Sequence, residues 1–409
     1  MMVYQSPIGA RDLLPLDVAQ KIWIEKRLQE VFQRWSYHRI ITSTLERLDT
    51  LMAGGAIERS TVIQFQDAED EVLGLRPEIT ASIARTAVTR MLDEPYPQRL
   101  YYNGNIFRRS LNNSEGGQHE FYQAGVELLG AAGIVADGEI LLLLLDCLQN
   151  LQLNQWHLIL GEADLTRSLL SAFPVGWQGK IRKAIANLDR VTIENLPLSP
   201  EQIEKALFLF ELRGKPADVL QRVSSLDLDV NQREIVNNLK SLVDLLTDSL
   251  PSPLPLILDL SLLQTFDYYT GIVFEIVSNT DGGTCILGRG GRYDRLLELY
   301  HPKNQQISGI GFALNLEDLH NVLQYTNLLP TEIPPSNWLV VPINSQAYSA
   351  AFSYAQKLRE SSDLMQVEVN LLAEKTPAEV REYARQKGIA KIAWVKEKSE
   401  PEIEIVGAS

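Results

Sequence analysis

The stretch YYNGNIFRRSLNNSEGGQHEFYQAGVELLG, residues 101–130, predicts two strands joined by a polar, glycine-containing loop at 110–118. Side chains alternate along a strand, so the second strand has one polar and one apolar face. Its polar face carries Gln123, Gly125 and Glu127. Polar groups buried without partners cost about 1–3 kcal/mol each. This face is therefore either open to solvent or the floor of a ligand pocket, in which Gly125 leaves room for the ligand.

Composition indicates a globular chain of two or three domains, with 409 residues, of which 45% are hydrophobic and 22% charged. The most apolar run, Ile140–Leu145, is far shorter than the roughly 18 residues of a membrane span. The first residues lack the layout of a signal peptide. Cys147 and Cys285 are too few for a disulfide framework, and five scattered histidines show no metal spacing. We expect a cytoplasmic protein without a metal or cofactor.

The net charge of −14 bears on the choice of partner. A protein that binds polyanionic RNA usually carries a basic excess on some face. The acidic balance favours small-molecule or protein partners over nucleic acid.

The order of predicted elements divides the chain. Residues 1–325 form a core that begins with a helix at Leu16–Trp35, contains a buried helix at Glu139–Leu151 and is interrupted by a helical insertion at about 164–250. Prolines mark a linker at 326–337. Residues 338–409 alternate the apolar runs WLVVPI, VEVNLL and KIAWV with helical segments, which predicts a small α/β domain of βαβαβ type.

Three other stretches could contribute to a ligand site, although each also has a purely structural interpretation. LRPEIT, 75–80, places Glu78 and Thr80 on one face if it is extended, but it also suits a plain turn and helix start. GRGGRYDRLLELY, 288–300, predicts a glycine-rich turn leading into a helix, with Tyr293 as a pocket wall. It lacks the full glycine pattern of a nucleotide-binding loop. LLQTFDYYTGIVFEI, 262–276, places polar and aromatic residues at the head of a buried strand.

In chain order, the segments LRPEIT, FRR with HEFYQAGVE, LLQTFDYYTG, GGRYD and GIGFALNLEDL resemble the catalytic core of histidyl-tRNA synthetases over about residues 5–325. The opening Gly9–Asp12 resembles that family's start, and the tail resembles a shortened anticodon-binding domain. The resemblance implies an α+β fold of the class II synthetase type, with an antiparallel sheet flanked by helices, and a homodimer.

The same resemblance implies a pocket for histidine. Carboxylates, a hydroxyl and an amide can hold the α-ammonium and an imidazole N–H, and aromatic walls exclude water. Arg108 matches an arginine that contacts the α-phosphate and the substrate carboxylate. The residues implied to line the pocket are Glu78, Thr80, Gln123, Glu127, Tyr268 and Tyr269, with Tyr293 beside them.

Three positions depart from the synthetase pattern. Gln264 stands where the pattern has a catalytic arginine, Asp318 replaces an ATP-binding arginine, and His119 replaces the arginine of Arg-Glu-Phe. One unit charge at about 6 Å is worth roughly 3 kcal/mol at an effective dielectric near 20. The losses predict weak ATP binding. An ordinary account of Asp318 also exists, because it suits the first turn of a helix that Asn315 could cap.

A kept histidine pocket with a lost ATP site resembles the synthetase paralogues that are regulatory subunits of ATP phosphoribosyltransferase in histidine biosynthesis. This implies a non-catalytic subunit, with histidine as its effector, that forms a homodimer within a larger hetero-oligomer with a short-form catalytic subunit. The tail agrees, because residues 338–409 hold nine Lys and Arg against ten Asp and Glu. Two alternatives stay open, namely an active histidyl-tRNA synthetase with atypical ATP-site residues and a free-standing histidine- or RNA-binding regulator.

Overall fold

The computed structural model describes residues 6–7, 9–55, 57–109, 117–251, 253–262, 269–280, 283–362, 364–371 and 375–406. The chain divides into two compact units, Met1–Pro330 and Thr331–Ser409, which are described separately.

The predicted strand pair lies inside the large sheet of the first unit. β5 (Gln98–Phe107) and β6 (Glu120–Leu129) pair in antiparallel fashion, with Tyr102 opposite Gly125. The apolar face of β6 packs into the main core through Val126 and Leu128. The strand alternation expected from the sequence is confirmed.

The strands of this sheet run in the order β1-β5-β6-β12-β11-β10-β7-β9-β8. Its pairs are antiparallel except β1–β5 and β7–β9, so the sheet is mixed rather than purely antiparallel. Parallel neighbours need a long crossover, and the helical segment between β7 and β9 supplies one. The other strands are β1 (His38–Arg39), β7 (His157–Glu162), β8 (Arg213–Gly214), β9 (Leu256–Asp259), β10 (Ile272–Thr280), β11 (Gly283–Arg292) and β12 (Gly309–Asn315).

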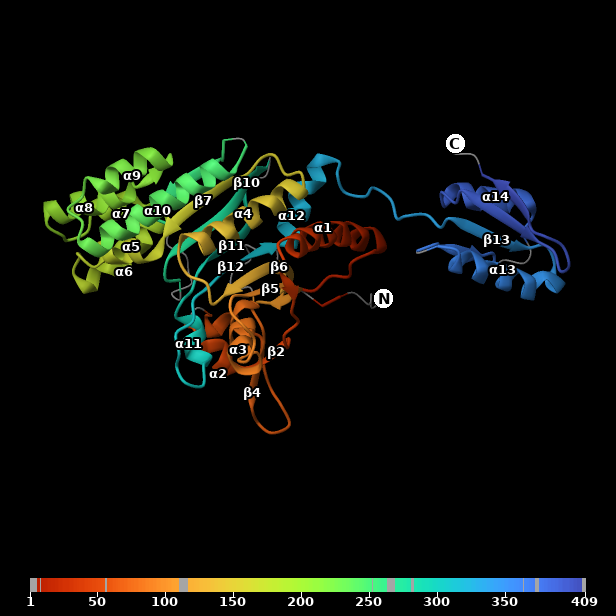
Figure 1. The fold of residues 1–409 in the computed structure, drawn as a ribbon, viewed down its shortest axis with the longest axis horizontal. Coiled ribbons are helices and arrows are strands. Elements are labelled where there is room, and N and C mark those ends of the chain that lie inside the picture. Colours follow the sequence, from red (N-terminus) through yellow and green to blue (C-terminus); the bar gives the residue numbers. More distant parts are fainter. Residues whose placement is uncertain are drawn as a thin grey trace, which may run out of the picture. The chain divides into compact units, whose positions relative to one another are not determined.

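Helices flank the sheet, as Figure 1 shows. α1 (Pro15–Arg34), α4 (Ile134–Asn150) and α12 (Leu316–Leu323) contribute their apolar stripes to the main core. α3 (Thr80–Arg90) and α11 (Leu296–Tyr300) belong to a second apolar cluster with Tyr102 and Leu100 of β5. The pocket-forming face of the sheet is the one that this second cluster covers.

Two further groups of elements complete the unit. The segment between β7 and β9 folds into helices, with capping boxes that start α8 at Ser199 and α10 at Asp229. These helices are α5 (Ala163–Leu170), α6 (Val175–Ala186), α7 (Arg190–Glu194), α8 (Pro200–Phe210), α9 (Pro216–Ser224) and α10 (Val230–Ser249). A small sheet joins β2 (Leu45–Arg47), β4 (Val72–Leu75) and β3 (Gln64–Gln66) beside α2 (Leu48–Met52).

The predicted glycine-rich turn at 288–292 is wrong. These residues form the end of strand β11, which pairs with β10 and β12 on its two sides. A β-carbon at Gly290 would collide with the Phe274 ring and the Gly311 carbonyl. The glycines therefore serve close packing within a sheet rather than a turn.

The second unit has the predicted βαβαβ order. Its sheet runs β14-β13-β15-β16, and the edge strand β16 is antiparallel and was not expected. Its elements are β13 (Trp338–Pro342), α13 (Tyr348–Glu360), β14 (Val367–Val369), α14 (Pro377–Gln386), β15 (Lys391–Val395) and β16 (Glu402–Ile405). None of the helices in the described part of the chain has the length and apolar character that crossing a bilayer requires.

Candidate functional site

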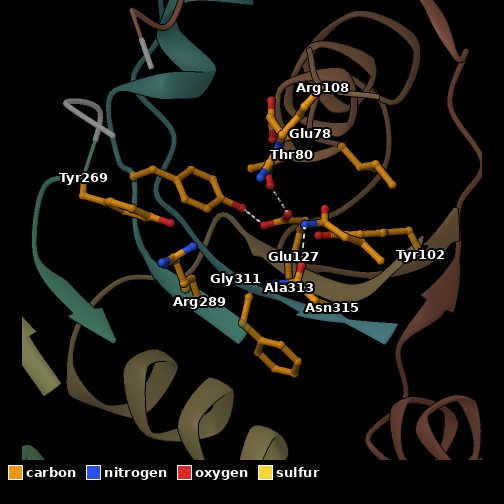
Figure 2. Close-up of a pocket in the computed structure, with 15 residues that line it drawn as sticks. Glu78, Thr80, Tyr102, Arg108, Glu127, Tyr269, Arg289, Gly311, Ala313 and Asn315 are labelled. Carbon is orange, nitrogen blue, oxygen red and sulfur yellow. Dashed lines mark hydrogen bonds between the residues drawn. The ribbon is translucent and has the colours of Figure 1, made fainter. Parts of the chain in front are cut away.

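A cavity of about 130 Å³ opens on the sheet face that α3 covers (Figure 2). Strands β5, β6, β11 and β12 form its floor, and the segments around Glu78 and Tyr269 form its walls. Its lining residues are Glu78, Ile79, Thr80, Tyr102, Arg108, Gln123, Glu127, Tyr269, Arg289, Gly290, Tyr293, Gly311, Phe312, Ala313 and Asn315.

Cross-strand register explains why this part of the sheet is hollow. Glu127 lies opposite Gly311, and Gly125 lies opposite Ala313. A β-carbon at Gly311 would collide with the Glu127 carboxylate. Small residues at these positions leave the space that larger side chains would fill.

Glu127 is the most enclosed polar group of the pocket, with 1% of its surface exposed. Its carboxylate accepts a hydrogen bond from Thr80 Oγ1 at 2.7 Å and another from the Tyr293 hydroxyl. Burial raises the pKa of Glu127 to about 8, although both hydroxyl donors favour its charged form. The side chain therefore holds a proton at neutral pH and can share it with a ligand.

Glu78 is buried at the start of α3. Its Oε1 accepts the Ala81 N–H at 2.9 Å, and burial raises its pKa while the nearby Arg108 charge opposes part of the rise. Arg108 Nε donates to the Pro77 carbonyl at 2.8 Å. The LRPEIT segment thus supplies a carboxylate to this wall, and its Pro77 carbonyl holds the Arg108 guanidinium beside it.

Gln123 and Asn315 face each other across the floor. Gln123 Nε2 donates to Asn315 Oδ1 at 3.0 Å. Asn315 stands at the N-cap position of α12, but its side chain is used in this bond, so the predicted side-chain cap is wrong. Asp318 does lie in the first turn of α12, as expected.

The structure brings together Glu78, Thr80, Arg108, Gln123, Glu127, Tyr269 and Tyr293 around this one cavity. Tyr268 and Gln264 lie outside the described residues. Asp318 and His119 are not among the lining residues: Asp318 Oδ1 accepts from Cys285 Sγ at 3.5 Å, and His119 Nδ1 lies 3.1 Å from the Arg108 carbonyl oxygen.

Sequence reasoning missed Tyr102 and Arg289. Tyr102 is buried opposite Gly125, and Arg289 is opposite Ala313. The signal that could have found them is strand register, because residues directly opposite on antiparallel strands point to the same face. In the described residues no group of three or more His, Cys, Asp or Glu side chains could hold a metal ion.

Comparisons with known proteins agree with this geometry. A family model for histidyl-tRNA synthetase matches residues 9–319. The chain is 63% identical to the ATP phosphoribosyltransferase regulatory subunit of Nostoc punctiforme, over 98% of this chain and 99% of the relative, and 59% identical to that of Gloeothece citriformis, over 99% and 100%.

Solved structures of similar fold include members of the same two groups of proteins. A Bacillus halodurans protein described as an ATP phosphoribosyltransferase regulatory subunit/histidyl-tRNA synthetase has a TM-score of 0.81 at 26% identity, with 96% of this chain and 98% of that chain covered. A Nostoc histidyl-tRNA synthetase has a TM-score of 0.78 at 17% identity, with 96% and 91% covered, which shows the shared fold.

Proposed function

The chain belongs to the ATP phosphoribosyltransferase regulatory subunits, within the histidyl-tRNA synthetase family, and from this premise we propose that it binds free histidine and controls a separate catalytic subunit. That partner is a short-form phosphoribosyltransferase that makes phosphoribosyl-ATP in the first step of histidine biosynthesis. The chain itself contributes regulation rather than catalysis.

The observation that carries the proposal is the enclosed Glu127 carboxyl with its two hydroxyl partners. Such a carboxyl can accept a hydrogen bond from an imidazole N–H, and Tyr293 and Thr80 hold the carboxyl in place. Elsewhere in the pocket, Glu78 on the wall and the Gln123 amide oxygen on the floor offer acceptors for an α-ammonium. A ligand with an imidazole at one end and an ammonium at the other matches both.

The assembly belongs to the same proposal. The chain forms a homodimer within a larger hetero-oligomer with the catalytic subunit, in the cytoplasm. The net charge of −14 and the balanced charge of residues 338–409 support a protein partner over a nucleic acid. Cys147 and Cys285 are both free thiols, in keeping with a reducing compartment.

Regulation of a distant active site requires that histidine bind two states of the complex with different affinities. In the complex Glu127 shares one proton with the imidazole, and removing such a charge-assisted hydrogen bond costs about 1.5–3 kcal/mol, so Glu127→Ala should raise the half-inhibitory histidine concentration about ten- to hundredfold. The measurement is the initial rate of phosphoribosyl-ATP formation against histidine concentration, normalised to the uninhibited rate of each complex.

Glu120→Ala is the matched control, because Glu120 is on the same strand β6 but outside the pocket lining. Co-purification of the chain from its native cell with a phosphoribosyltransferase is expected. A Glu127→Ala complex of normal assembly with an unchanged inhibition curve would show that histidine acts elsewhere.

A further inference from the structure

Arg289 lines the pocket with a charge that the proposed role leaves unused. Its Nε donates to Glu275 Oε1 on the neighbouring strand at 2.7 Å, and the Glu275 side chain is only 13% exposed. Glu275 bonds only the Nε of this guanidinium. The two Nη groups of Arg289 have no hydrogen-bond partner among the described residues. The side chain remains 43% exposed. The Nη groups are therefore available to a ligand.

Register places this guanidinium across the floor from Glu127. Arg289 on β11 is opposite Ala313 on β12, which in turn is opposite Gly125 on β6. Strands β6 and β11 are two spacings, or about 10 Å, apart. The residues of β12 that lie between them on this face, Gly311 and Ala313, are small, so the space above them is open to a ligand. Figure 2 shows the Arg289 guanidinium on the side of Tyr269, well away from Arg108.

Arg108 is less suited to bind a ligand carboxylate. Its Nε is engaged by the Pro77 carbonyl, the residue has a further interaction that Arg289 lacks, and its charge acts on the buried Glu78 carboxyl. Glu275 is close enough to orient Arg289, but it uses only Nε. The two Nη groups of Arg289 therefore stay available, and side by side they can bind a carboxylate through two parallel hydrogen bonds.

We infer that Arg289 binds the free carboxylate of an α-amino-acid ligand, with Glu275 as the residue that positions it. The inference rests on the proposed function and deepens it. A pocket that uses Arg289 in this way selects free histidine over derivatives whose carboxyl is reduced, amidated or esterified. It accounts for the sensing of the free end product rather than of an activated form.

The test is titration calorimetry on the full chain with two probes, L-histidine and L-histidinol, which carries an alcohol in place of the carboxylate. Arg289→Gln should weaken L-histidine binding about ten- to hundredfold and change L-histidinol binding by less than about threefold. Arg295→Gln is the matched control, because Arg295 is an exposed arginine just beyond the same strand and outside the pocket lining. It should leave both affinities unchanged.

A second variant guards against misfolding. Arg289→Gln leaves Glu275 without its partner, whereas Arg289→Gln with Glu275→Gln keeps this pair of positions neutral and should show the same selective loss of histidine. If the unaltered chain binds histidine but these variants weaken both probes equally, or neither, the inference fails and the proposed function stands. The same holds if Arg108→Gln alone removes the preference for histidine. If the unaltered chain binds neither probe, both ideas fail.

Discussion

At the scale of single residues, Glu127 links ligand binding to pH. Its pKa of about 8 means that the empty pocket carries one proton at neutral pH, while a free imidazole is mostly neutral above about pH 6.5. The complex then holds one proton between the imidazole and Glu127. Binding neither takes up nor releases a proton between these two values.

This predicts a plateau of histidine affinity between about pH 6.5 and 8. Above pH 8 the free protein has lost the shared proton and must regain it on binding, so affinity should fall about tenfold per pH unit. Below pH 6.5 the imidazolium must release a proton, and affinity should fall again. Calorimetry across pH 5.5–9.5 measures the curve. Loss of the proton of the ligand's own α-ammonium lowers the affinity of both forms at high pH, so the test is the difference between them. Glu127→Gln cannot ionise, and its affinity should fall less steeply above pH 8 than that of the unaltered chain; curves of equal steepness would contradict the assignment of the titrating group.

Some contacts of single residues can be predicted from the sequence and others cannot. Alternation along β6 is local, so the shared face of Gln123 and Glu127 follows from the sequence. The bond from Tyr293 to Glu127 joins residues 166 positions apart. Such a contact depends on how distant strands and loops are placed, which no local pattern encodes.

At the scale of elements, strand β12 keeps the pocket open through Gly311. A β-carbon there would collide with the Glu127 carboxylate and the Val126 carbonyl. Gly311→Ala should therefore abolish measurable histidine binding and cost about 1–3 kcal/mol of unfolding free energy, as overpacking does. Denaturant unfolding and calorimetry check the two parts.

Gly179→Ala is the control for this variant. Gly179 is exposed within helix α6, and a β-carbon there meets nothing within 4 Å. Alanine should stabilise the helix by about 0.5–1 kcal/mol and leave histidine binding unchanged. Normal histidine affinity in Gly311→Ala would mean that the cavity is not the binding site.

The sequence patterns did not predict which strands pair with one another or in what register. The segment GRGGR was predicted as a turn, because glycines often mark turns. In the sheet, neighbouring strands approach so closely that only glycine fits at Gly290. Glycine can therefore indicate either a turn or a close approach of strands, and the pairing of β11 with β10 and β12 shows that here it is the second.

At the scale of the whole molecule, family membership and the altered synthetase positions predict that the chain alone does not activate histidine. Gln264 and Asp318 replace two arginines of the synthetase pattern, so charge on a transferring phosphoryl group lacks part of its stabilisation. Histidine-dependent exchange of pyrophosphate into ATP should stay at background, with a histidyl-tRNA synthetase as positive control. Exchange at an ordinary synthetase rate would restore the synthetase alternative. Gln264→Arg with Asp318→Arg need not recover activity, because the surrounding residues have also changed.

The sequence by itself determined the polar face of β6, the long helices, the βαβαβ order of the second unit, and the family, which close relatives confirm. These features depend on local periodicity or on ordered motifs, both of which are written along the chain. The tertiary structure alone decided that Asn315 pairs with Gln123 instead of capping α12, that Tyr102 closes the pocket, and that Arg289 enters it. Each depends on which strands become neighbours and in what register, and that choice is made by the packing of the whole sheet rather than by any one segment.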